Sequence, residues 1–346
     1  MRTDRARQRF LTTALLVIVP VLHGVTFEQN RFDSLQDQMT SYSVDTYYDN
    51  GAPRFVWLDE PASVELSIGT VELAYMISLF PNGLINTADF RSPQRVTTPV
   101  GTIDATGVTF HENGQLHMVH FEDDQTIATP MGDAVARQYV TFHENGSVDE
   151  FRLARPRELS GAFGTFMADS TVGFDARGAL ALMEARVPQT VFLPDGSKAD
   201  VELIRLHENG VVSLVQFDAP RFLETPRITF NDAILSTFNH DGTYDIVGVI
   251  QPLTYETPGG TFEMLGVALL PDGNPAGGIL TAPYTAETVA GAIPLAIAIF
   301  REDGSLQRAA PLDVMTIDGL EYDYRSWMVF DPEGNLTGQF LSELFY

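Results

Sequence analysis

The stretch Val108-Thr-Phe-His-Glu-Asn-Gly-Gln-Leu116 is the one that decides the fold. It recurs as Val140-Thr-Phe-His-Glu-Asn-Gly-Ser-Val148 and as Ile204-Arg-Leu-His-Glu-Asn-Gly-Val-Val212. Apolar residues alternate up to the Asn-Gly pair, and another apolar residue follows two positions after it. Asn and Gly both tolerate the positive φ angles of a type I′ turn, so each copy predicts a tight β-hairpin.

Glycines at the position of Gly114 recur along the chain at steps of 30 to 32 residues. The members of this first series are Gly51, Gly83, Gly114, Gly146, Gly178, Gly210, Gly242, Gly273, Gly304 and Gly334. A second series lies between them, at Gly69, Gly101, Gly132, Gly164, Gly196, Gly260, Gly291 and Gly319. Two interleaved series with one period predict a repeat protein. The pattern is irregular at Ile228, where a glycine is missing, and around Ala282.

Each repeat can be divided into short strands. Residues six and four positions before a first-series glycine are mostly apolar, as at Val108 and Phe110. After the glycine, apolar residues follow at two, five and seven positions, and the step of three predicts a β-bulge. A second motif, Val96-Thr-Thr-Pro-Val-Gly101, predicts another turn, because Pro lacks a backbone donor and Gly permits a sharp reversal. We therefore expect about three strands in each repeat.

The fold class that follows is all-β, as an elongated, open antiparallel array of about ten units of 31–32 residues. A closed β-propeller is the alternative, but ten units exceed the usual number of blades, and the unit is short for a four-stranded blade. We expect residues 1–24 to form a signal peptide or N-terminal anchor and residues 25–63 a connector and N-terminal cap. Residues 64–346 would form one continuous hairpin repeat domain that ends in a C-terminal cap.

The hairpins of the type Phe110-His-Glu-Asn-Gly-Gln-Leu116 resemble the MORN-like and antitoxin-like hairpin repeats of bacterial proteins. The resemblance covers only the hairpin half of each unit, because the Thr-Pro-x-Gly turn and the repeat length differ from the MORN pattern. It implies an array that serves as a binding or spacing module. It implies no ligand and no functional residue.

Composition restricts the location and the partners. The chain has 46 acidic and 21 basic residues and a formal charge of −25, which argues against nucleic acid or an anionic membrane surface as a partner. It has no cysteine, which excludes disulfides and thiolate chemistry.

Arginines at the N-terminus precede the apolar run Phe10 to Leu22, which predicts a secretory signal. We expect a secreted or periplasmic protein, or one anchored in the membrane by an uncleaved N-terminal segment.

Histidines and acidic residues in the turns are weak candidates for a metal site. His111, His143 and His207 share one position of the repeat, and each precedes a glutamate. Turns on successive repeats lie roughly 10–15 Å apart, too far for one coordination sphere. The Asp-Gly turns lack the dense carboxylates of a calcium loop. We expect turn roles for these residues, with no metal and no cofactor.

Aromatic residues gather at the two ends of the array. The candidate binding residues are Tyr48, Phe55, Trp57, Tyr322, Tyr324 and Trp327. Aromatic side chains are frequent at recognition hot spots, and they are equally suited to covering the open ends of a sheet. The sequence favours covering of the ends, with binding as the alternative.

The expected function is that of a non-enzymatic binding scaffold outside the cytoplasm, for a protein or a polysaccharide. A structural spacer of the cell envelope is one alternative. An enzyme with a site in an irregular repeat is another, but the sequence contains no nucleophile elbow, zinc-protease motif or phosphate-binding loop. The unequal units around Ile228 and Ala282 are where a site is expected.

Overall fold

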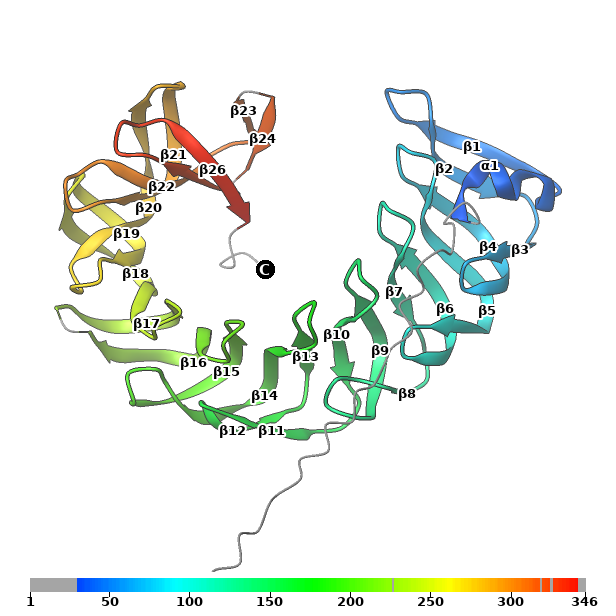
Figure 1. Ribbon diagram of the computed structural model, residues 1–346, viewed down its shortest axis with the longest axis horizontal. Helices are drawn as coiled ribbons and strands as arrows, with labels where there is room; N and C mark the ends of the chain where they lie inside the picture. The colour runs from blue at the N-terminus through cyan, green and yellow to red at the C-terminus, as the bar shows by residue number, and fades with distance from the viewer. Residues whose placement is uncertain (1–29, 226, 318, 324–325, 342–346) are drawn as a thin grey trace, which may run out of the picture.

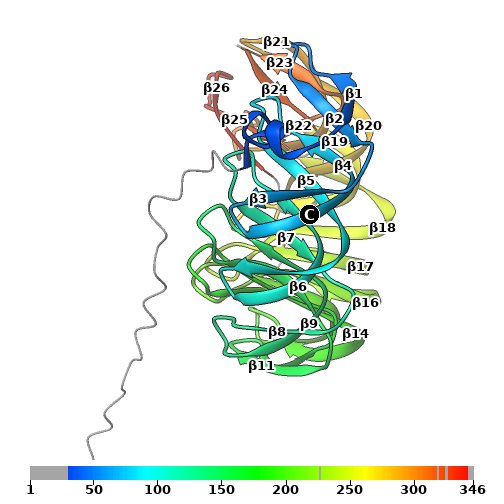
Figure 2. The same cartoon turned by 90° about the vertical axis from the view of Figure 1, so that its right-hand side faces the viewer.

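The structure is a computed structural model that describes residues 30–341, except 226, 318, 324 and 325. The expected signal or anchor, residues 1–24, lies outside the described residues. Within them, 22 strands form one long antiparallel sheet. The sheet curves into an open arc, and its two ends stay apart (Figures 1 and 2). The predicted open array is therefore confirmed, and the chain does not close into a propeller.

The ten first-series turns each join two neighbouring strands of this sheet. They connect β1 (Tyr42–Tyr47) to β2 (Pro53–Leu58), β4 (Gly69–Leu79) to β5 (Ile85–Thr98), β6 (Gly101–Phe110) to β7 (Leu116–His120), β9 (Ala134–Phe142) to β10 (Val148–Leu153), β13 (Thr171–Phe174) to β14 (Leu180–Phe192), β15 (Lys198–Leu206) to β16 (Val212–Glu224), β17 (Thr229–Phe238) to β18 (Tyr244–Thr257), β19 (Gly260–Leu269) to β20 (Pro275–Thr288), β21 (Gly291–Phe300) to β22 (Leu306–Pro311) and β25 (Ser326–Phe330) to β26 (Leu336–Leu341). The remaining strands are β3 (Ala62–Leu66), β8 (Gln125–Ile127), β11 (Arg157–Gly161), β12 (Gly164–Ala168), β23 (Met315–Ile317) and β24 (Leu320–Tyr322).

A regular unit contains two long strands, and one of them bends. Along β5, Asp89 pairs with Gly107 and Gln94 pairs with Ala105, so five steps on β5 oppose two steps on β6. The same excess occurs in β14, β16, β18 and β20. The sequence predicted one strand after the first-series glycine and a separate short strand before the Thr-Pro turn. In these units the two predicted strands form one bent strand. The extra residues bulge out of the ladder at the bend.

The first-series turn differs from the predicted type I′. In the copy at residue 114, the N–H of Gly114 donates to His111 O at 2.8 Å, and the N–H of His111 donates to Gln115 O at 2.7 Å. Only glycine has a positive φ in this turn, because Gln138 is the one described non-glycine residue with a positive φ. The turn is a three-residue loop of type I followed by a glycine bulge. The glycines of the series have φ between +78° and +86°, so the requirement for Gly at this position was predicted correctly.

The predicted bulge after each turn is present. Thr109 pairs with Met118 and Phe110 with Leu116, so one step on β6 opposes two on β7. The Thr-Pro-x-Gly motif closes a two-residue turn, in which Thr98 pairs with Gly101. The Thr98 hydroxyl donates to Gly101 O at 2.7 Å. This bond stabilises the turn. The Thr288 hydroxyl makes the same bond, to Gly291 O at 2.8 Å, which explains why this turn keeps threonine although it lacks proline.

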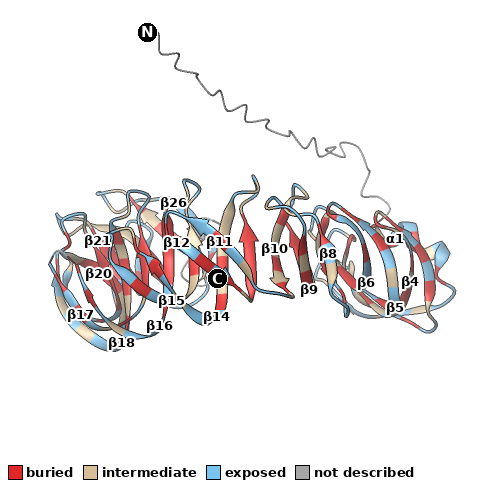
Figure 3. Ribbon diagram, turned by 90° about the horizontal axis from the view of Figure 1, so that it is seen from below, coloured by how far each residue is buried: buried red, intermediate tan, exposed pale blue. Residues whose placement is uncertain are grey.

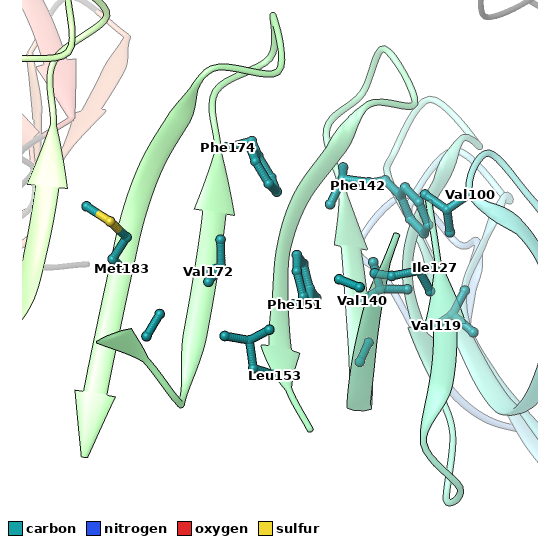
Figure 4. Packing of buried hydrophobic residues seen from close by; sticks show 14 of the residues in the cluster. Val100, Val119, Ile127, Val140, Phe142, Phe151, Leu153, Val172, Phe174 and Met183 are labelled. Carbon is teal, nitrogen blue, oxygen red and sulfur yellow. The ribbon is translucent and has the colours of Figure 1, made fainter. Parts of the chain in front are cut away.

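Buried residues run along the whole array (Figure 3); one apolar cluster extends from Phe32 to Leu269 and a second from Ala286 to Phe330. Positions six and four residues before the first-series glycines supply much of this core, as predicted. Figure 4 shows its middle part, where Phe142, Phe151 and Phe174 lie on neighbouring strands. All three are buried, and the rings of Phe151 and Phe174 are 6.4 Å apart. Each unit packs on the next, so the units stabilise one another in sequence.

The last third of the sheet has an additional apolar layer on a second face. Ile246, Ile297, Ile299 and Trp327 are buried there in a separate cluster. Position five before the glycine shows the change: it is Thr109 and Thr141 in early units and Ala268 and Ile299 in late ones. Here the sheet curls tightly enough for Arg308 on β22 to reach Asp245 on β18, at 2.9 Å.

The N-terminal end of the array carries a short helical segment. Helix α1 (Phe32–Leu35) and the 3₁₀ turn η2 (Gln36–Gln38) precede β1. Phe32 and Leu35 are buried, and the Phe32 ring meets Tyr42 edge to face at 5.4 Å. The region predicted as connector and cap, residues 25–63, thus contributes β1 and β2 to the sheet. Neither of the two described helices has the length or the apolar run needed to cross a bilayer.

Candidate functional site

The predicted aromatic residues at the N-terminal end remain accessible in part. Trp57 is 45% exposed on β2, where it pairs with Met76 of β4. Tyr48 and Phe55 are half-buried, and the Arg54 guanidinium lies 5.6 and 5.4 Å from their ring centres. The Tyr48 hydroxyl donates to Leu79 O at 2.8 Å, so this ring is fixed to the next unit. Only Trp57 of the three presents a large free surface.

The predicted aromatic residues at the C-terminal end lie in the core. Tyr322 is buried in the cluster that contains Met328 and Phe330. Trp327 is buried in the second apolar layer, with the Arg308 guanidinium 5.3 Å from its ring centre. Tyr324 lies outside the described residues. The side chains of Tyr322 and Trp327 thus fill space within the array and present little surface to solvent.

The histidines of the repeat connect adjacent units. Nε2 of His111, His143 and His207 lies 2.7–2.8 Å from the backbone carbonyls of Phe142, Phe174 and Phe238, respectively, in the next unit. Each histidine thus satisfies a carbonyl beside the following turn. Among the described residues, no three His, Asp or Glu side chains gather closely enough to hold a metal ion. The geometry thus gives these histidines a structural role: each links its unit to the next by a hydrogen bond.

The asparagines of the turns make a parallel set of bonds. Oδ1 of Asn145 accepts the Ser147 N–H at 2.9 Å, while its amide donates to Ala176 O in the next turn at 2.7 Å. Asn50, Asn82 and Asn209 likewise donate to the next unit, at 3.0, 2.8 and 3.1 Å. The aspartates at the same position, such as Asp241 and Asp303, keep only the bond within the turn. Asparagine is therefore both a turn residue and a link between units.

The units that looked irregular in sequence fold like their neighbours. Thr225 is the turn threonine of its unit, like Thr98; it donates to Ile228 O at 2.9 Å and accepts the Ile228 N–H at 3.1 Å. Ile228 thus occupies the place of the missing glycine. Ala282 lies in the bend of β20, which has the same excess of residues as other bends. The Ile228 turn and the Ala282 bend therefore leave the strand pairing of their units unchanged.

An exposed apolar patch, which the sequence did not predict, lies where β17, β18 and β19 pass the bend. We call Ile234, Ile250 and Leu265 the bend patch; they are 37, 53 and 37% exposed. They occur on three consecutive strands at one level of the register. Eight residues before the glycine, unit two has the exposed Tyr75 and units three to six have Thr106, Gln138, Ser170 and Glu202, whereas the next two have Ile234 and Leu265. That break in the pattern was a readable signal.

A shallow groove adjoins the bend patch. Its hollow of about 460 Å³ is lined by Ile234, Ile250 and Pro220, with the carboxylates of Glu202 and Asp218. A second hollow of about 530 Å³ shares Asp218, Ala219 and Pro220 with the first and continues to Phe222. Phe222 is largely exposed. The two hollows adjoin each other, with Ile250 in the first and Phe222 in the second.

A further acidic group, Asp232, lies near the groove. Asp232 accepts the N–H of Gln251, next to Ile250, at 2.8 Å. Burial raises the pKa of Tyr255, and the nearby charge of Asp232 raises it further. Two cations, Lys198 and Arg221, line the second hollow, and the Arg221 guanidinium is occupied by Lys198 O at 3.1 Å and the Phe217 ring at 5.0 Å. The hollow beside Ile250 therefore presents acidic charge.

Comparisons with known proteins give no family. No protein-family model matches the chain, and no curated protein does. Among solved structures, the TcdB2-TccC3-Cdc42 complex matches with 9% identity and a TM-score of 0.13, over 87% of this chain and 14% of that one. TcdB2-TccC3 without its hypervariable C-terminal region matches with 10% identity and a TM-score of 0.14, over 86% of this chain and 15% of that one. The chain thus spans about one seventh of the length of these neighbours.

Proposed function

We propose that the protein is an extracytoplasmic binding scaffold that holds a protein partner at the bend patch and the adjoining groove. The observation that carries the proposal is the switch from polar to apolar side chains at one repeat position, in the units where the groove lies. Solvation favours polar residues at an exposed repeat position, and units three to six have them. Contiguous exposed apolar groups beside a groove are typical of interaction surfaces.

The chemistry of the groove favours a particular class of partner. Glu202 and Asp218 line the hollow next to Ile234 and Ile250. A segment with an apolar anchor next to a lysine or arginine would bury its side chain on the patch and pair its cation with these carboxylates. The chain's charge of −25 would attract such a segment from a distance. A polysaccharide is less suited to the first hollow, because the one aromatic ring that lines it, Phe217, is buried.

The test is a selection of random displayed peptides on the purified protein, followed by affinity measurements on two variants. Ile250→Asp changes the patch, while Val187→Asp makes the same change at a 62% exposed bend residue two units away. We expect selected peptides to pair an apolar residue with Lys or Arg. Ile250→Asp should weaken them at least roughly tenfold, or about 1.4 kcal/mol, and Val187→Asp should not. Equal affinity of both variants would contradict the proposal.

A second candidate is a structural spacer of the envelope. It is supported by the hydrogen bonds that histidine and asparagine side chains make to the next unit. These bonds restrain each turn relative to its neighbour. The two functions differ in their dependence on Ile250, because a spacer tolerates Ile250→Asp without loss. Mass spectrometry of the mature N-terminus tests export in both cases: loss of a segment near residue 24 supports a secreted form, and an intact Met1 in membranes supports an anchored one.

A further inference from the structure

Five Asn-Gly pairs lie in exposed turns of the array, and they are not equivalent. Four of the asparagine amides, at Asn50, Asn82, Asn145 and Asn209, donate to a carbonyl of the next unit. Asn113 is exposed, and its Oδ1 accepts the Gln115 N–H at 2.9 Å. Within the described chain, its amide nitrogen donates no hydrogen bond. From this difference we infer that Asn113 is a modification site, the residue of its repeat position that deamidates fastest.

The reaction needs no enzyme and no cofactor. The backbone nitrogen of Gly114 attacks Cγ of Asn113, the new C–N bond closes a five-membered succinimide, and the side-chain nitrogen leaves as ammonia with the displaced proton. Water then opens the ring to aspartate or to isoaspartate, and the chain gains one negative charge. Glycine has no side chain to obstruct the attack, which makes Asn-Gly the reactive pair.

Rotation of the side chain limits this attack in a folded turn. Cγ must move toward the backbone nitrogen of the glycine, so each hydrogen bond of the side chain opposes the motion. Asn145 and Asn209 are held at both ends, by a bond within the turn and by a bond of 2.7 or 3.1 Å to the next unit. Asn113 is held at one end only. The glycine N–H is bonded equally in all three turns, at 2.8 Å.

Formation of isoaspartate at residue 113 would also change a contact outside the turn. Gly114 O accepts the buried amide of Asn30 at 3.0 Å, and the same amide donates to Ser67 Oγ at 2.8 Å. Isoaspartate adds one carbon to the backbone between residues 113 and 114, which displaces this carbonyl. Conversion at Asn113 therefore loosens the contact that ties Asn30 to the array. Plain aspartate leaves the backbone unchanged, and Asp241 and Asp303 already occupy equivalent turns.

The test is incubation of the full chain at mildly alkaline pH, with peptide mapping by mass spectrometry. Asn145 and Asn209 are matched internal controls, since all three sites share His-Glu-Asn-Gly. In the folded chain we expect Asn113 to react roughly fivefold faster than either, the factor that one net hydrogen bond implies. In denaturant the three rates should converge. Asn113→Gln should abolish the mass shift at 113 and leave Asn145 unchanged.

Two results would overturn the inference. Equal rates in the folded chain, or a faster reaction at Asn145 or Asn209, would show that the bond to the next unit does not protect. A faster reaction at Asn113 in denaturant as well as in the folded chain would assign the difference to local sequence instead of to the structure.

Discussion

At the scale of single residues, the turns show how one position performs two tasks. The sequence predicted the hairpins from Asn and Gly, because their tolerance of turn conformations is a local property. It could not predict that the Asn145 amide reaches Ala176 or that His143 reaches Phe174, since those contacts depend on the distance between successive turns. The turn type was also wrong, because the left-handed conformation is needed at glycine alone.

The link made by asparagine should be measurable as stability. Asn145→Asp keeps the acceptor for Ser147 N–H and loses the donor to Ala176 O. We expect it to lower the free energy of unfolding by about 1 kcal/mol, the net worth of a hydrogen bond. Asn113→Asp adds the same charge without losing a bond to the next unit, so it should cost less than about 0.5 kcal/mol. Equal losses in chemical denaturation would argue against the link.

His117 gives a pH dependence with a defined sign. Burial lowers its pKa, and the neighbouring His111 ring, 4.4 Å away, lowers it further; Asp149 acts in the opposite direction. The unfolded chain takes up the proton near pH 6.5, while the folded chain resists it. This histidine therefore lowers stability progressively as the pH falls below about 6.5, and its effect is absent well above that value.

Variants of two histidines on β7 test that sign. His117→Gln should flatten the part of the stability profile between about pH 6.5 and 5, measured by denaturant unfolding at each pH. His120→Gln, at an exposed position of the same strand, should keep the wild-type slope. The aspartates with lowered pKa, including Asp241 and Asp303, lose their contribution as the pH falls below about 4, outside this window. An unchanged slope in His117→Gln would contradict the assignment.

At the scale of elements, the repeat depends on strands that bend and bulge at fixed places. The bulge after each turn was predictable, because a step of three between apolar residues breaks strand parity. The long bend was not, since the extra residues, such as Arg91 and Ser92, are exposed and leave no apolar pattern. Proline ten residues after the glycine was the overlooked signal: it occurs at Pro93, Pro156, Pro188, Pro220, Pro252 and Pro283. Proline lacks the N–H that a ladder needs.

Core packing between adjacent units can be tested with one large side chain. Phe151 on β10 is buried and packs toward Phe174 of the next unit (Figure 4). Phe151→Ala should destabilise the protein by about 3–5 kcal/mol, because it removes apolar contacts and leaves a cavity. Phe222→Ala, at an exposed phenylalanine, should change stability by no more than about 0.5 kcal/mol. Similar thermal shifts in the two variants would contradict the core described here.

At the scale of the whole molecule, the period of the sequence was enough to predict an open array of about ten units. The curl of the last third was not predictable in advance. It depends on a second apolar face that becomes visible only when Thr109 and Thr141 are compared with Ala268 and Ile299. The end aromatics illustrate the same limit, because Trp57 and Trp327 look alike in sequence, yet only Trp57 is exposed. The bend patch corresponds to a change from polar to apolar residues eight positions before the first-series glycine. That change is recognisable only when the alignment of the repeats is known.

Small-angle X-ray scattering of a chain that begins at residue 30 tests the open array most directly. A compact protein of this length has a radius of gyration of about 20 Å. The open arc predicts a clearly larger value and a distance distribution with a long tail, because its ends stay apart. A radius near 20 Å with a symmetric distribution would show a closed or globular particle and would contradict the account.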